Sequence, residues 1–184
     1  SILIIVMSVM NGFKTELTKK ILGLNPHIII ESNGYKINDK FINELKNTIK
    51  NIEISKTFSG EGVVIGNGNA KGVILKGLDV NNNKDFKFLK NSTNNVMKIE
   101  EGEVYVGAEL AFNLKLEIGD KINLMSSVFI ATPFGGFPKQ ESYTIAGVFN
   151  TGFYEFDQNF IFLNLKDSLN IFEKEEDDKN IEIY

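Results

Sequence analysis

The sequence predicts an α+β fold built around a mixed sheet. Strand and helix patterns alternate in the first half of the chain, whereas residues 101–184 hold several short strands and few helical segments. The chain has 184 residues, of which 42% are hydrophobic and 11% aromatic, and this is enough to bury a core. We therefore expect one large domain or two small ones.

The first 26 residues predict the end of a membrane helix followed by a connecting helix. The opening SILIIVMSVM is almost wholly apolar, but it is shorter than the roughly 20 residues that cross a bilayer. A buried core strand is the alternative for residues 1–10. Residues 11–26 have helical periodicity, which ends at Gly23 and Pro26. The apolar residues of that pattern are Met10, Phe13, Leu17, Ile21 and Leu24. We expect the chain to begin inside a longer protein.

Residues 27–79 predict a β-α-β-β unit. A strand at 27–31 precedes a helix that Asn38 can cap. One face of that helix is predicted to carry Phe41, Leu45 and Ile49. The strand pattern then covers, in order, residues from 52 onward, 62–65 and 72–78, with a hairpin turn at 66–71.

The second half predicts shorter elements. Helices are expected at 108–114 and 165–172, and residues 173–180 form a charge run that we expect to be solvated. The final IEIY begins another strand, so we expect the protein to continue beyond it. The predicted strands are 103–106, 121–125, 142–149 and 160–164.

The stretch 126–138, SSVFIATPFGGFP, has no charged residue in a chain that is 24% charged. It contains three phenylalanines, two prolines and the Gly135-Gly136 pair, between two predicted strands. An apolar loop of this kind either folds onto the core or is held out to bind a partner. The residues alone leave both possibilities open.

Composition excludes several kinds of chemistry. The net charge is −4 and all 20 positive residues are lysines, so the chain lacks the basic, arginine-rich surface typical of nucleic-acid binding. Cysteine is absent, and the single histidine, His27, cannot by itself form a zinc site. No nucleophile elbow or Walker A sequence occurs. We predict a non-catalytic domain that binds or transmits, without cofactor or metal.

Three blocks resemble known transporter domains. MSVMNGF at 7–13 with ILGLNP at 21–26, and FNTGFYEFD at 149–157, resemble lipoprotein-releasing ABC transporter permeases of the LolC/LolE type. Residues 107–120 resemble a pattern shared with MacB-type periplasmic domains. The resemblance implies a two-lobed MacB-like fold. The implied division is a porter-like mixed α/β lobe at 27–79 plus 180–184, and a sabre-like β-rich lobe at 80–179 inserted into it.

The same resemblance implies a function. Permeases of this family lie in the bacterial inner membrane, with this domain in the periplasm, and extract outer-membrane lipoproteins for a soluble carrier, LolA. A LolD-type cytoplasmic ATPase and a second permease subunit are the other implied partners. ATP hydrolysis would take place on the separate ATPase.

The LolC side of the family carries a protruding loop, the hook, which binds the carrier and whose position matches 126–138. The implied hook residues are Val128, Phe129, Ile130, Thr132, Pro133, Phe134, Gly135, Gly136, Phe137 and Pro138. A neighbouring polar pad would fall on Asn123, Gln140 and Glu141, where the family's basic residues are not matched.

Residues 151–157 look more like the LolE side of the family, so a hybrid LolF-type permease acting as a homodimer would combine both features. A MacB-like efflux or toxin-export permease shares the two lobes and is one alternative. A soluble binding module unrelated to transport is another.

Overall fold

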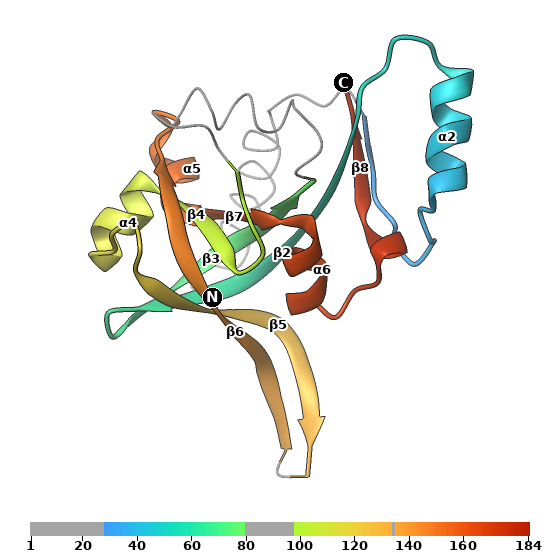
Figure 1. The fold of residues 1–184 in the computed structure, drawn as a ribbon. Helices are drawn as coiled ribbons and strands as arrows, with labels where there is room; N and C mark the ends of the chain where they lie inside the picture. Colours follow the sequence, from blue (N-terminus) through green and yellow to red (C-terminus); the bar gives the residue numbers. More distant parts are fainter. Residues whose placement is uncertain (1–27, 80–97, 134) are drawn as a thin grey trace, which may run out of the picture.

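The computed structural model describes residues 28–79, 98–133 and 135–184 (Figure 1). The predictions for residues 1–10 and 11–26, for His27 and for Phe134 lie outside these ranges. Within these ranges, eight strands form one mixed sheet in the order β1-β8-β2-β3-β7-β4-β6-β5, accompanied by four α-helices and one 3₁₀ helix. The predicted α+β class with a mixed sheet is confirmed.

The elements follow one another in chain order. The strands are β1 (Ile28–Ile30), β2 (Ile54–Gly66), β3 (Asn69–Leu78), β4 (Glu103–Gly107), β5 (Lys121–Thr132), β6 (Gly135–Phe149), β7 (Phe160–Asn164) and β8 (Asn180–Ile183). The helices are α2 (Asp39–Thr48), α4 (Ala108–Leu114), α5 (Tyr154–Asn159), α6 (Leu165–Ile171) and the 3₁₀ helix η1 (Glu176–Asp178).

Six of the strands close into a ring, because β5 pairs with β2 as well as with β6. The ring runs β2-β3-β7-β4-β6-β5, with parallel pairing of β3 with β7 and of β4 with β6. Among the described residues, the largest buried apolar cluster comes from these strands together with α4 and α6. It includes Val64, Leu75, Leu110, Leu124 and Ile145. The ring is therefore a barrel with a packed interior.

A smaller unit lies beside the barrel and is continuous with it through β2. The first residues of β2 pair with β8 (Ile54 opposite Ile183), while later ones pair with β5 (Gly62 opposite Ser126). β8 lies between β1 and β2, and α2 runs alongside these strands (Figure 1). A separate apolar cluster joins them, made of Ile37, Ile42, Ile54, Ile181 and Ile183. The predicted C-terminal strand is confirmed, with a partner on each side.

Several local predictions are confirmed. The Asn38 side chain caps α2 by accepting the Phe41 N–H at 2.9 Å. The hairpin between β2 and β3 turns at Asn67 and Gly68, with φ of 48° and 77°, the left-handed backbone of a type I′ turn. The helix at 108–114 and the strand at 160–164 have the predicted bounds.

Three details differ from the predictions or were not predicted. On α2, Leu45 of the predicted face packs partly against the small cluster, whereas Phe41 and Ile49 are exposed and Ile42 is the buried residue, because the small unit covers only a narrow stripe of this helix. Helix α5 was not predicted, since it is short and no side chain caps its start. The run 173–180 is not simply solvated: Lys179 is buried and its Nζ donates to the Glu176 carbonyl at 3.1 Å.

Candidate functional site

The uncharged stretch 126–138 is not a loop between short strands. β5 continues to Thr132 and β6 already begins at Gly135, so the two strands form one long hairpin. The β-branched and aromatic residues before Pro133 favour extended backbone, and the turn falls at the proline. We call residues 129–138 the arm. Its cross-strand partners are Phe129 with Pro138, Ile130 with Phe137, Ala131 with Gly136 and Thr132 with Gly135.

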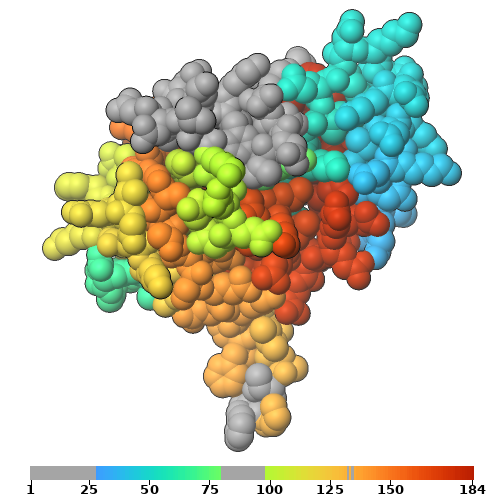
Figure 2. Space-filling model, viewed as in Figure 1, coloured from blue at the N-terminus to red at the C-terminus, as the bar shows by residue number. Residues whose placement is uncertain are grey.

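The arm stands out from the barrel (Figure 1), and Figure 2 shows it as a knob beyond the rest of the surface. β5 pairs with β2 only as far as Ser126, and Val128 packs partly against the barrel core. Beyond that point the exposed fractions are 68% for Phe129, 40% for Ile130 and 55% for Phe137. Of the two possibilities that the residues left open, folding onto the core is therefore wrong.

Apolar side chains cover both faces of the arm. Residues directly opposite each other in an antiparallel pair share a face, so Ile130 and Phe137 lie on one face and Phe129 and Pro138 on the other. A strand pair that packs one face on its own protein normally carries polar residues on the other. This arm has an apolar surface on both sides, and no residue between 129 and 138 is charged.

Exposed apolar side chains also occur elsewhere, so exposure alone does not select the arm. Phe112 on α4 is 80% exposed, and Ile118, Phe153 and Tyr154 are exposed as well. These residues, however, lie on helices and turns packed against the barrel, with charged residues such as Glu109 and Glu155 among them. The arm differs because its whole length is uncharged and stands clear of the body.

The predicted pad residues lie at the base of the arm, on different faces of the hairpin. Asn123 lies opposite Ser142, whose hydroxyl donates to the Asn123 side chain. Gln140 is exposed on that same face, two residues along β6. Glu141 points to the other face, towards α6. The three residues thus do not form one polar surface.

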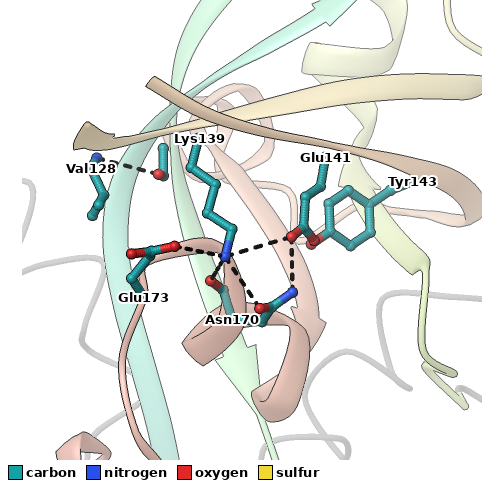
Figure 3. A network of polar contacts seen from close by, with 7 residues as sticks. Val128, Lys139, Glu141, Tyr143, Asn170 and Glu173 are labelled. Atoms are coloured by element: carbon teal, nitrogen blue, oxygen red, sulfur yellow. Dashed lines mark hydrogen bonds and ion pairs between the residues drawn. The ribbon is translucent and has the colours of Figure 1, made fainter. Parts of the chain in front are cut away.

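Glu141 belongs to a network between β6 and the end of α6 (Figure 3). Its carboxylate accepts the Asn170 amide at 2.8 Å and the Tyr143 hydroxyl at 3.0 Å. Burial raises the pKa of the Tyr143 phenol, and the neighbouring Glu141 carboxylate adds to this shift, so the hydroxyl remains a donor. Lys139 Nζ donates to the Asn170 carbonyl at 2.7 Å and to Glu173 Oε1 at 3.3 Å. Sequence reasoning missed Lys139, Asn170 and Glu173.

The chain matches lipoprotein-releasing system transmembrane proteins LolC from several bacteria. It is 23% identical to that of Xylella fastidiosa over 172 residues, which cover 91% of this chain and 42% of the relative. For Neisseria meningitidis the identity is 28% over 177 residues, with 90% and 41% covered. For Buchnera aphidicola from Schizaphis graminum it is 30% over 177 residues, with 91% and 42% covered.

The chain is homologous to LolC. It spans about two fifths of the length of these curated relatives. No family model matches the chain.

The second block that resembles this family, 149–157, has a packing role in the structure. Asp157 is buried, and its carboxylate accepts the Thr151 N–H at 2.9 Å and the Thr151 hydroxyl at 2.7 Å. Phe149 and Phe156 lie in a buried aromatic cluster, where the rings of Phe149 and Phe162 are 5.1 Å apart. In this LolC homologue the block thus fixes α5 against the barrel.

The remaining features of the described residues do not add a second candidate site. A hollow of about 850 Å³ is lined by residues that include Asp79 and Lys98, the two described neighbours of segment 80–97. Within the described ranges, no group of three or more histidine, aspartate or glutamate residues could hold a metal ion. Among the described helices none is long and apolar enough to cross a membrane.

Proposed function

We propose that this chain is the periplasmic domain of an inner-membrane permease subunit, which passes outer-membrane lipoproteins to a LolA-type carrier through the arm. Two observations support this: the homology to LolC and the projecting arm with apolar side chains on both faces. The arm carries the proposal, because it is the segment to which the resemblance assigns the family's hook. In this assignment the hook is residues 128–138, with Pro133 and Phe134 at its tip.

The chemistry of the arm suits a transient protein contact. Burying one phenylalanine in a partner contributes about 1.5–3 kcal/mol, enough for docking without permanent capture. Pro133 and Pro138 restrict the backbone before binding, which lowers the entropy cost of ordering it. Of the predicted pad residues, Asn123 and Gln140 share a face at the base of the arm and would contact the carrier there, whereas Glu141, which binds Asn170 on the other face, would meet a different part of the carrier. Because they are neutral or acidic, the carrier surface that meets them would not be acidic.

The rest of the assembly is part of the same proposal. The porter-like lobe would comprise residues 27–79 and 180–184, and the sabre-like lobe residues 80–179. The small apolar cluster around Ile42 and Ile181 supports a unit of its own beside the barrel, although the later half of β2 and all of β3 pair along the barrel. A LolD-type ATPase and a second permease subunit, identical or different, would complete the transporter, and this domain would not be catalytic.

The direct test is titration calorimetry of the chain with the LolA-type carrier of the same organism. A Pro133→Gly/Phe134→Ser variant should bind at least about tenfold more weakly, as expected for the loss of one buried phenylalanine. Phe112→Ser is the control, since it removes an exposed phenylalanine from α4, outside the arm. Absence of binding by the intact, folded chain would contradict the proposal and favour a MacB-like export role.

A further inference from the structure

The arm leaves the body at an interruption of the hairpin ladder. Pairing is regular up to Met125 opposite Gln140 and resumes at Phe129 opposite Pro138. Three residues of β5, 126–128, therefore face a single residue of β6, Lys139. β5 also loses its second neighbour here, because its pairing with β2 ends at Ser126. Extra residues on one strand bend a hairpin, and two strands alone are only marginally stable, so this is the point where the arm can change direction.

Lys139, the residue opposite the interruption, is anchored to α6 (Figure 3). Its side chain is only 15% exposed. The ammonium lies 2.7 Å from the Asn170 carbonyl, 3.2 Å from Asn170 Oδ1, 3.3 Å from Glu173 Oε1 and 3.8 Å from Glu141 Oε1. A cation at the C-terminal end of a helix is favourable, because the last carbonyls carry partial negative charge.

The helix that receives Lys139 is itself fixed to the barrel. The Ser168 hydroxyl donates to the Phe58 carbonyl of β2 at 3.1 Å. Phe172 packs closely over Gly60, where an added Cβ would lie 2.4 Å from the ring. The network also closes on β6, since Asn170 donates to Glu141. Lys139 thus links the register shift of the hairpin to a helix that is held against the barrel.

We propose that Lys139 is a positioning residue: its contacts with Asn170 and Glu173 set the angle at which the arm leaves the barrel. The geometric part of this inference does not depend on the proposed function. Its consequence, that Lys139 presents the arm to a protein carrier, rests on the proposed function. Without these contacts the pairing of Ser126 with β2 and the partial packing of Val128 still tie the arm to the barrel but leave its angle unfixed, so the arm pivots beyond Ser126 and spends less time in the orientation that binds. A local bond at the same point, from the Val128 N–H to Ser126 Oγ at 3.3 Å, cannot hold the arm to the body, because both residues lie on β5.

The test compares Lys139→Met with Lys121→Met. Methionine keeps the apolar stem of lysine and removes its charge and its donors, and Lys121 is an exposed lysine at the start of the same hairpin. Because the chain has no cysteine, spin labels can be placed specifically at Ala131→Cys on the arm and Phe112→Cys on α4. Electron–electron distance measurements should give a narrow distribution for the parent and for Lys121→Met, and a broader or shifted one for Lys139→Met.

Calorimetry on the same variants, without labels, gives the second readout. We expect Lys139→Met to bind the carrier about tenfold more weakly, the loss that follows if the competent orientation falls to about a tenth of the population. An unchanged distance distribution would overturn the inference, whether or not binding is lost, since lost binding alone would mean that Lys139 contacts the carrier. A broadened distribution together with no carrier binding by the parent chain would keep the positioning role and contradict only the proposed function.

Discussion

The two halves of the β5–β6 hairpin are parts of the same strands, yet they differ in how deeply their apolar side chains are buried and in how apolar and polar residues are ordered. In the half nearest the barrel, apolar residues alternate with polar ones, and Ile122, Leu124, Tyr143 and Ile145 are buried. In the arm the apolar residues are consecutive and are exposed on both faces. Hydrophobic content alone therefore does not predict burial. The alternation of apolar and polar residues along a strand does predict burial, because it places all the apolar side chains on the one face that packs against the core.

The difference begins where the neighbours of β5 change. Up to Ser126 the strand lies between β2 and β6, and its inward side chains meet the barrel core. After Ser126 only β6 pairs with β5 in the described part of the chain, and beyond Val128, which still packs partly against the core, the side chains of Phe129, Ile130 and Phe137 are exposed. An exposed apolar surface without charged residues lowers solubility, so a role in binding is the simplest explanation for the composition of the arm.

The largest expected effect compares one residue from each half. Leu124→Ala removes a fully buried side chain from the barrel and should lower the free energy of unfolding by about 2–5 kcal/mol. Phe129→Ala, five residues along the same strand, should change it by less than about 0.5 kcal/mol, because the ring is exposed. Urea unfolding followed by circular dichroism measures both. Similar losses for the two variants would mean that the arm packs on the body in solution.

A smaller effect concerns the pH dependence of stability, which we expect from Asp167 in the body of the protein. Burial raises the pKa of Asp167, against the opposing effect of its bond from the Gly102 N–H at 2.8 Å. The native state then holds this proton at pH values where the unfolded chain has released it. The protonated Asp167 therefore contributes to the free energy of unfolding in full below pH 3.8, the ordinary pKa of the group, and this contribution falls as pH rises through the pKa of the folded state. Asp167→Asn should remove this fall, which unfolding curves at several pH values would detect. Parallel pH dependences of parent and variant would exclude it.

The smallest expected effect is that of salt on carrier binding. Because no residue from 129 to 138 is charged, binding through the arm should change by less than about threefold between roughly 0.05 and 0.5 M salt. Calorimetry at a series of salt concentrations measures this. A steep loss of affinity would instead place the contact on charged groups at the base of the arm, such as Glu141 and Glu173.

Local pattern predicted most of the elements but not their assembly. The Asn38 cap, the turn at Asn67 and Gly68 and the helix at 108–114 depend on neighbouring residues, which the sequence displays directly. Closure of the barrel depends on pairing β2 with β5, whose residues Gly62 and Ser126 are far apart in the chain. Periodicity within each strand carries no information about that partner.

The candidate site was predictable in part for the same reason. Lack of charge and turn residues marked 126–138 as unusual, but the strand bounds extend further than the turn chemistry indicated. The contact of Lys139 with Asn170 joins residues 31 positions apart and exists only because α6 packs on β2. A single lysine in an alternating strand is indistinguishable from an ordinary surface residue.

The most direct test of the arm as the binding surface is amide hydrogen exchange of the chain with and without its LolA-type carrier. We expect the carrier to slow exchange in residues 129–137 and at the base of the hairpin, with no change in α4 or α5. Slowing centred on Phe112 or Phe153, with the arm unchanged, would show that the carrier binds elsewhere and would contradict the account.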